Sequence, residues 1–417
     1  MTRGEGPPFS ERSESLATHL ECSRGGEDFQ LDTLQQTCAN DGGPLLVRYN
    51  LERVHEAMKR EILARRPATM WRYRELLPMD DPAHVVTLGE PMTPLLDARR
   101  IGEELDLPNL RVKDEGLLPT GTFKARGAAV GVTRALELGV STIALPTAGN
   151  AGAAWGAYGA RAGIRVVVVM PDTTPQTIVR ETTSYGAEVY LVPGSIADAG
   201  AVVKRACLER GWYDASTLKE PYRIEGKKTM GFELAEQLEW TLPDVIVYPT
   251  GGGVGLIGMW KGFAELREIG WISRDDMPRF VSAQAAGCAP IVTAFESGAS
   301  ESEPWPDPRT FAAGLRVPKA LGDFLVLRAL RESDGIALSV TDDEMRDMMR
   351  LVGTMEGMLV CPEGAAAIAA AAKLRRDGWI RDDESVVVFN TGSGLKYAES
   401  LQGEAARPLE AGALPDA

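Results

Sequence analysis

Three segments of the chain share one layout that restricts the possible folds. Each is an apolar run rich in β-branched residues, then a turn with glycine, then a stretch of small residues with helical character: STIALPTAGNAGAAWGAYGARAG from Ser141, DVIVYPTGGGVGLIGMWKGFAEL from Asp244 and SVVVFNTGSGLKYAES from Ser385. Alternating strand and helix is typical of a parallel sheet covered by helices on both faces, where ligands bind at the carboxyl ends of the strands. We therefore expect an α/β fold with two doubly wound lobes and parallel-type sheets.

The composition narrows the classes of partner. The 417 residues carry 45 Lys and Arg against 59 Asp and Glu, a formal net charge of −14, which gives no overall attraction to nucleic acid or to anionic lipid. The N-terminus lacks the apolar core of a signal peptide, and the longest apolar run is too short to span a bilayer, so we expect a cytoplasmic protein with a small-molecule ligand. The five scattered cysteines predict no disulfide framework.

The densest glycine turn, PTGGGVG, predicts a phosphate-binding loop. Gly251, Gly252, Gly253 and Gly255 leave the backbone N–H groups accessible, and the helix that follows directs its positive end to the same place. Neither the Walker spacing nor the dinucleotide-binding spacing of glycines is present, which argues against a nucleotide-binding regulator. Taken alone, the glycines are equally compatible with a tight turn packed against a neighbour.

Two further turns and one lysine supply polar groups. PTAGN carries Thr147 and Asn150, and NTGSG carries Thr391 and Ser393, all at expected strand ends. Each of these side chains could contact a ligand or could simply cap its own helix. Lys124 stands in PTGTFKARG, beside a phenylalanine in a turn before a helix-like run. Burial there would lower the pKa of the lysine and suit it to form a Schiff base.

These motifs resemble the pyridoxal-phosphate enzymes of the tryptophan-synthase β-subunit type (fold type II), and within them the threonine synthases. The resemblance extends from VVTLGEPMTPLL at Val85 to TGSGLKY at Tyr397 and includes VKDEGLLPTGTFKARG, AGNAG, YRIEGKKTMGFELAEQL, MWKGFAEL and CPEGAAAIAA in the family's order. It implies pyridoxal 5′-phosphate as cofactor, in the cleft between the two lobes. The implied roles are the Schiff-base lysine for Lys124, a contact with the cofactor's 3′-oxygen for Asn150, a contact with its pyridine nitrogen for Thr391, and phosphate binding for Gly251, Gly252, Gly253, Val254 and Gly255.

The resemblance also implies an activity. A hydroxyl at the pyridine nitrogen favours elimination and replacement at the β or γ carbon. A threonine synthase converts O-phosphohomoserine and water to threonine and phosphate, so the substrate brings a second phosphate that needs cationic donors. The candidates for binding the substrate are Thr147, Ala148, Gly149, Arg223 and Lys227, with Lys219 as an added cation.

Departures from the threonine-synthase pattern leave a second activity open. Ala125 stands where threonine synthases usually have aspartate and resembles the serine and threonine dehydratases instead. The family's phosphate-binding Asn-Ser-x-Asn-Pro-x-Arg appears as TLKEPYR, with the polar pair replaced. The alternative is therefore an ammonia-lyase acting on threonine or serine, or another elimination or replacement enzyme; Arg223 would then merely pair with Glu220 or Glu225 on the surface. A non-catalytic relative would lack the lysine or the glycine turn, and both are present.

The N-terminal segment resembles the small zinc-ribbon-like module that precedes many threonine synthases and carries Cys-x-x-Cys twice. Gly25 and Asp41 stand where the second cysteines would be, so two thiolates are missing. His19, Cys22, Cys38 and Asp41 could form a weak four-ligand site. Because the spacing matches no strong zinc pattern, we expect a metal-free β-knuckle and no stoichiometric metal.

The expected organisation combines these parts. Both ends are polar or rich in Gly, Pro and Ala, which predicts tails. The family resemblance implies a homodimer. The expected parts are a tail at 1–16, the zinc-ribbon-like module at 17–50, a large α/β domain from 51–135 and 220–402, a small α/β domain at 136–219, and a tail at 403–417.

Overall fold

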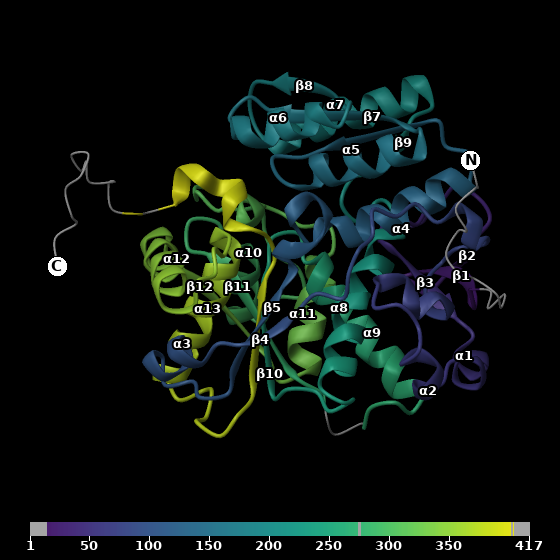
Figure 1. Ribbon diagram of the computed structural model, residues 1–417. Coiled ribbons are helices and arrows are strands. Elements are labelled where there is room, and N and C mark those ends of the chain that lie inside the picture. Colours follow the sequence, from purple (N-terminus) through teal and green to yellow (C-terminus); the bar gives the residue numbers. More distant parts are fainter. Residues whose placement is uncertain (1–14, 274–276, 402, 404–417) are drawn as a thin grey trace, which may run out of the picture.

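The computed structural model describes residues 15–273, 277–401 and 403. They form three β-sheets and the helices that cover them (Figure 1). The tails expected at the two ends lie almost entirely outside the described residues. Within the described ranges, no helix combines the length and the apolar character needed to cross a membrane.

The largest sheet has six strands in the order β12-β11-β10-β13-β5-β4. Its strands are parallel except β4, which is antiparallel to β5. Val245 of β10 pairs with Arg279 of β11 and with Val386 of β13, so the glycine turns after β10 and β13 lie at the same edge of the sheet. The strands are β4 (Leu95–Asp97), β5 (Leu110–Asp114), β10 (Val245–Pro249), β11 (Arg279–Ala285), β12 (Ile336–Val340) and β13 (Val386–Asn390).

Helices cover both faces of this sheet, which is why its central strands are continuously apolar. Ile246 packs into the core formed with α8, α9, α10 and α11, whereas Val245 and Val247 pack into the core formed with α3, α12 and α13. The helices are α3 (Arg99–Glu104), α8 (Arg223–Gln237), α9 (Val254–Glu268), α10 (Pro290–Glu296), α11 (Asp323–Glu332), α12 (Asp342–Glu356) and α13 (Pro362–Arg376).

The second sheet has four parallel strands in the order β8-β7-β6-β9 and lies at the top of Figure 1. Val166 and Val168 of its central strand pack on the side of α5 and α6, and Val167 and Val169 pack against α7. The elements are β6 (Thr142–Pro146), α5 (Ala151–Ala162), β7 (Arg165–Pro171), α6 (Gln176–Ser184), β8 (Glu188–Val192), α7 (Ile196–Arg210) and β9 (Tyr213–Asp214). The predicted α/β fold with parallel sheets is thus confirmed, while the division into domains stays a prediction.

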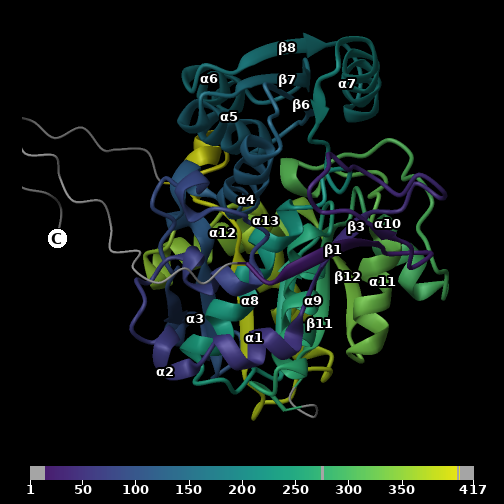
Figure 2. The same ribbon diagram turned by 90° about the vertical axis from the view of Figure 1, so that its right-hand side faces the viewer.

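A small antiparallel sheet, β2-β1-β3, precedes both lobes; it lies on the right in Figure 1 and faces the viewer in Figure 2. Cys22, at the end of β1, and Cys38 lie close together near Asp41. The fourth member of this group is Glu27. His19, which the sequence offered as a candidate ligand, lies apart from this group, 3.3 Å from Asp28. The strands are β1 (Ala17–Cys22), β2 (Asp28–Phe29) and β3 (Leu45–Tyr49), followed by α1 (Leu51–Ala57) and α2 (Arg60–Leu63).

Helix α4 (Lys124–Glu137) crosses α8 at two glycines. A β-carbon at Gly226 would collide with the carbonyl oxygen of Arg126, and one at Gly127 would lie 2.9 Å from the carbonyl oxygen of Arg223. Only glycine therefore allows the two helices to approach this closely. Short 3-10 helices complete the chain: η1 (Met70–Leu76), η2 (Pro82–His84), η3 (Glu115–Leu117), η4 (Pro119–Gly121), η5 (Ala313–Leu315) and η6 (Gly394–Ser400).

A buried ion network fixes the first turn of α4. The Arg126 guanidinium donates from Nε to Glu115 and from Nη1 to Glu233, each at 2.6 Å, and Lys113 Nζ donates to Glu233 at 2.9 Å. All four side chains are fully buried. Burial alone would raise the pKa of Glu233, but Arg126 and Lys113 lower it to about 2, so the carboxylate stays ionised.

The close crossing of α4 and α8 can be tested by substitution. Gly226→Ala forces the added methyl against backbone, so we expect the free energy of unfolding to fall by about 1–3 kcal/mol, as in other overpacked sites. The measurement is the midpoint of urea unfolding followed by circular dichroism. Gly353→Ala on α12 is the matched control, because its nearest neighbours are 3.9 Å away and it should be neutral or slightly stabilising. Equal midpoints for the two variants would contradict the crossing.

Candidate active site

Lys124 opens α4 at the edge where the glycine turns of the large sheet lie. Its Nζ lies 4.4 Å from the centroid of the Phe123 ring, and no described residue accepts a hydrogen bond from it. Burial, reinforced by the positive charge of Arg223 and opposed by Glu363, lowers its pKa to about 8. At pH 7 about a tenth of such an amine is uncharged, whereas an ordinary lysine is almost wholly protonated. Lys124 is therefore suited to act as a nucleophile and as a base, as predicted.

The turn that begins at Gly251 places the N-terminus of α9 at the same edge. Gly253 stands directly before the first residue of α9, and its φ of 77° is a conformation that favours glycine. Side chains at Gly251 and Gly255 would collide with the carbonyl oxygen of Gly314 and the hydroxyl of Tyr248. The first N–H groups of a helix have no partner inside it and attract an anion. Close packing thus explains the glycines at residues 251 and 255, whereas a β-carbon at Gly252 would meet only the side chain of Thr217, at 3.2 Å.

Asn150 directs its amide into a chain of polar groups that the two lobes share. Its Nδ2 donates to the Tyr397 hydroxyl at 3.0 Å, and that hydroxyl donates to Glu363 Oε1 at 3.0 Å. The N–H of Gly314 donates to the same oxygen at 2.7 Å. Asn150 Oδ1 and Glu363 Oε2 are buried without a hydrogen-bond partner among the described residues. Buried polar atoms of this kind normally have a partner, so they fit a ligand with polar groups.

Thr391 and Ser393 have different roles. The carbonyl of Thr391 accepts from Phe123 N at 3.0 Å, which ties the turn after β13 to the residue before Lys124. Its hydroxyl lies 3.6 Å from the Cys361 sulfur. The Ser393 hydroxyl accepts from the N–H of Leu395 at 3.3 Å and caps η6, so the capping alternative holds for Ser393. Thr391 stays the candidate for contact with a ring nitrogen.

The Thr147 hydroxyl is engaged locally. It accepts from the N–H of Gly149 at 3.1 Å and fixes the turn between β6 and α5. This leaves the backbone of residues 147–149 as the part of the turn that could bind a carboxylate.

Arg223 is buried rather than on the surface, where the alternative placed it. Its Nε lies 3.3 Å from Glu220, its Nη1 donates to Thr217 at 3.2 Å, and its Nη2 donates to the carbonyl of Ala215. Burial raises the pKa of Glu220 despite Arg223, and it lowers the pKa of Arg223 despite Glu220. Their one long contact therefore does not offset the loss of hydration of both charges.

The two lysines named with Arg223 have partners of their own. Lys227 Nζ donates to the carbonyl oxygens of Phe123 and Lys124, at 2.7 and 3.1 Å, and so holds the turn that carries Lys124. Lys219 Nζ donates to Asp214 at 2.9 Å. None of these bonds was predicted from the sequence.

Two members of the site were missed as functional residues. Glu363 and Tyr397 stand in CPEG and TGSGLKY, which the sequence analysis quoted as motifs without giving these residues a role. A glutamate in an otherwise apolar stretch, one residue after the proline that starts α13, was the available signal. The Tyr397 contact spans 247 residues of chain and only the fold brings it to Asn150.

The described residues fit pyridoxal phosphate. Lys124 offers an amine with lowered pKa, the turn at residues 251–255 offers a helix N-terminus preceded by three glycines, and Asn150 offers a buried oxygen without a partner among the described residues. Thr391 would contact the ring nitrogen. The amine suits the aldehyde of pyridoxal phosphate, the helix N-terminus suits its phosphate, and Asn150 and Thr391 suit the polar groups of its ring.

Comparison with known proteins agrees with this geometry. Residues 86–392 match the family model described as pyridoxal-phosphate dependent enzyme. The chain is 36% identical to the threonine synthase of Methanocaldococcus jannaschii over 93% of this chain and 95% of that protein, and 38% identical to that of Methanosarcina acetivorans over 92% and 93%.

Solved structures show the same fold at lower identity. The processed form of threonine deaminase isoform 2 from Solanum lycopersicum superimposes with a TM-score of 0.63, at 21% identity, over 80% of this chain and 94% of that one. Diaminopropionate ammonia lyase from Escherichia coli superimposes with a TM-score of 0.66, at 19% identity, over 76% and 88%. With a family match over most of its length, the chain belongs to the pyridoxal-phosphate-dependent enzymes of fold type II.

Proposed function

We propose that the protein is a threonine synthase, which converts O-phosphohomoserine and water to threonine and inorganic phosphate. The identity of 36–38% with two threonine synthases over more than nine-tenths of the chain supports this. The homodimer and the cytoplasmic location expected from the sequence stay predictions.

The observation that carries the proposal is that three basic side chains, Lys124, Arg223 and Lys227, lie close enough to influence one another's charge. Burial and then the charges of Lys124, Arg223 and Arg126 lower the pKa of Lys227 well below its ordinary value. Arg223 in turn lowers the pKa of Lys124. Cations that disfavour one another in a buried place are stabilised by an anion. A phosphorylated amino acid brings such an anion in addition to the phosphate of the cofactor.

The residues of this chain then divide the work. Pyridoxal phosphate, when bound, supplies an electron sink for negative charge on the substrate carbon. The Lys124 amine, with a pKa of about 8, can take a proton from carbon and return it. Lys227 holds the turn of Lys124 through two carbonyl oxygens. The chain from Asn150 through Tyr397 to Glu363 holds the Asn150 amide in one orientation, from which its oxygen would contact the cofactor.

One observation favours the alternative, an ammonia-lyase acting on threonine or serine. The Arg223 guanidinium already donates to three groups of the protein, which leaves two of its five N–H groups for a substrate phosphate. Ala125, fully buried at the start of α4, is the residue type expected of the dehydratases. We favour the synthase because of the identity with two threonine synthases and because Nη1 and Nη2 of Arg223 each keep one N–H group for a phosphate.

The first prediction concerns the lysine that holds the cofactor. We expect the purified protein to be yellow and borohydride to fix the cofactor covalently to the peptide that contains Lys124, located by mass spectrometry. Lys113 and Lys227 are internal controls, because both are buried but engaged in hydrogen bonds. A label on either control, or on Lys396, would overturn the assignment.

The second prediction concerns pH. Because the pKa of Lys124 in the folded protein is lowered to about 8, its reactive uncharged form rises from about a tenth at pH 7 to about half at pH 8 and about nine-tenths at pH 9, and changes little above that. The rate at which apoenzyme captures pyridoxal phosphate, followed by absorbance, should therefore rise through pH 8 and level off. A rate that still climbs toward pH 10 would indicate an ordinary lysine.

The third prediction tests the phosphate-binding turn at Gly252. A side chain there meets only Thr217, so Gly252→Val should fold but should block the approach of the cofactor phosphate and retain little cofactor. Absorbance of the bound cofactor and circular dichroism measure the two effects. Gly353→Ala serves as the control. Full cofactor occupancy in Gly252→Val would mean that the phosphate binds elsewhere.

The fourth prediction separates the two activities. O-phosphohomoserine should yield equal amounts of phosphate and threonine, and Arg223→Lys should raise KM at least about tenfold because the bidentate donor is lost. Arg223→Lys keeps a charge for Glu220, and bound-cofactor absorbance verifies its fold. Arg165→Lys, in an exposed pair with Glu188, should behave as wild type. Rapid 2-oxobutyrate and ammonia from threonine, with no phosphate released from O-phosphohomoserine, would establish the lyase instead.

A further inference from the structure

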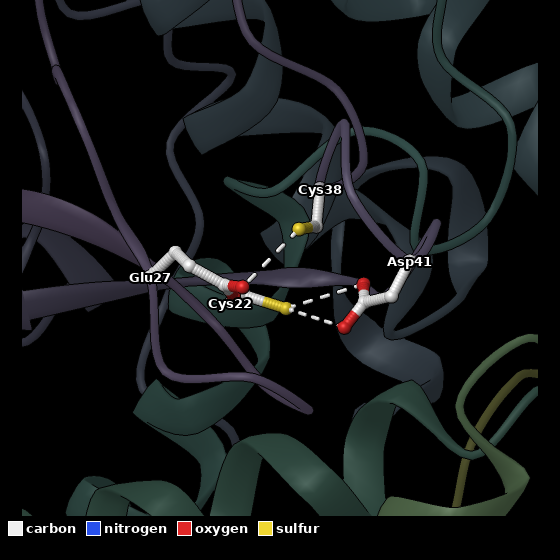
Figure 3. A group of neighbouring side chains, drawn as sticks. All are labelled: Cys22, Glu27, Cys38 and Asp41. Atoms are coloured by element: carbon white, nitrogen blue, oxygen red, sulfur yellow. Dashed lines mark hydrogen bonds between the residues drawn. The ribbon is translucent and has the colours of Figure 1, made fainter.

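Four side chains converge in the N-terminal sheet, far from the chemistry of Lys124. Cys22, Glu27, Cys38 and Asp41 each offer one ligand atom, and these atoms all lie within 4.8 Å of one another (Figure 3). Cys22 Sγ lies 3.4 Å from both oxygens of Asp41, and Cys38 Sγ lies 3.9 Å from Glu27 Oε2. Both cysteines are buried, whereas the carboxylates approach from exposed positions.

Two turns of the same construction present the two thiols. Four residues after Cys22 comes Gly26 with a φ of 78°, whose N–H donates to the Cys22 carbonyl at 3.0 Å. Four residues after Cys38 comes Gly42 with a φ of 71°, whose N–H donates to the Cys38 carbonyl at 2.9 Å. The N–H of each cysteine bonds back across its own turn, at 2.8 Å in both cases. The chain thus repeats one turn and points both sulfurs to one place.

Glu27 occupies the position that a side chain at residue 25 would take. Asp41 stands three residues after Cys38, and Gly25 stands three residues after Cys22. A β-carbon at Gly25 would lie 2.8 Å from the Glu27 carboxyl carbon and would collide with Oε2. The missing side chain at residue 25 is what allows Glu27 to reach the thiols. Two missing thiolates led to the expectation that no metal binds. The approach of Glu27 to the two cysteines is visible only in the structure.

Hydrogen bonds between thiols and carboxylates could explain the short distances but not the whole arrangement. The N–H groups of Arg24 and Gly25 both donate to Cys22 Sγ, at 3.4 Å, which fixes this sulfur in one position beside the carboxylates. No lysine, arginine or histidine among the described residues forms an ion pair with Glu27 or Asp41. Two carboxylates beside a sulfur that is surrounded by N–H donors are stabilised by a cation at their centre.

The distances suit zinc. Ligand bonds of about 2.0–2.3 Å in a tetrahedron give edges of about 3.3–3.8 Å, close to the sulfur–oxygen separations found here. Two thiolates and two carboxylate oxygens give a closed set of four ligands, which is typical of a structural rather than a catalytic site. The geometry points to a structural Zn²⁺ site formed by Cys22, Glu27, Cys38 and Asp41.

Such a site would pin the loop that joins β2 to β3 against the rest of the protein. The Gln36 side chain in this loop donates to the Asp214 carbonyl at 2.9 Å, and the Leu31 carbonyl accepts from Arg134 of α4 at 2.9 Å. Zinc would therefore stabilise contacts with both the four-stranded sheet, through β9, and α4, the helix of Lys124, without touching the reacting atoms.

Elemental analysis of the full-length holoenzyme, without an affinity tag and produced with added zinc under reducing conditions, tests the proposal. We expect one equivalent of zinc per chain, removed by a strong chelator with a fall in Tm that zinc restores. Co²⁺ in its place should give the absorption bands of a tetrahedral site with thiolate ligands. Zinc that stays at trace level after reconstitution would overturn the proposal.

Substitutions that leave the fold intact make the test specific to this ligand set. Glu27→Gln and Gly25→Ala should each weaken zinc affinity about tenfold or more, the second because its methyl displaces the Glu27 carboxylate. Gly200→Ala, whose nearest neighbour is 4.0 Å away, and His19→Ala should bind zinc as wild type. Cys22→Ser should lose it, with bound-cofactor absorbance as the check on folding. Unchanged affinity in both Glu27→Gln and Gly25→Ala would overturn the assignment of Glu27.

Discussion

The position of the reactive lysine depends on the buried ion network around Arg126. This guanidinium bonds to Glu115, at the end of β5, and to Glu233 of α8, and it stands two residues after Lys124. Removing one partner of such a buried pair typically costs about 3–5 kcal/mol, because the other charge is left without compensation. The network therefore holds α4 in one place relative to the sheet, and the crossing at Gly226 leaves α8 no room to shift.

Around this fixed point, the site leaves charges and polar atoms partly uncompensated. Lys124 has a lowered pKa, Arg223 and Glu220 share one long contact, and Asn150 Oδ1 has no partner among the described residues. Each feature costs stability in the protein alone and is relieved by a bound anion or polar ring. Such local conflicts are common where a fold serves chemistry, and the well-compensated network of Arg126 lies directly beneath them.

Much of the fold and the list of site residues followed from local patterns. The runs before Thr147, Gly251 and Thr391 are β6, β10 and β13 of parallel sheets because each is apolar on both faces. The hydrogen-bond and ion-pair partners of the site residues were less predictable. Ser393 caps its own helix, one of the two roles that the sequence allowed. Arg223 pairs with Glu220, as one alternative had it, but the pair is buried and not on the surface. Those outcomes depend on which groups lie opposite, and periodicity carries no such information.

The sequence by itself determined the order of strands, turns and helices, and the residue types that a phosphate and an aldehyde require, because these depend on near neighbours in the chain. Only the tertiary structure decided which distant groups meet. It brings Tyr397 to Asn150 across 247 residues and places the carboxylate of Glu27 where Gly25 has no side chain. The physical reason is that burial and close approach set the pKa of Lys124 and the ligand set around Cys22, and both arise only when separate elements pack together.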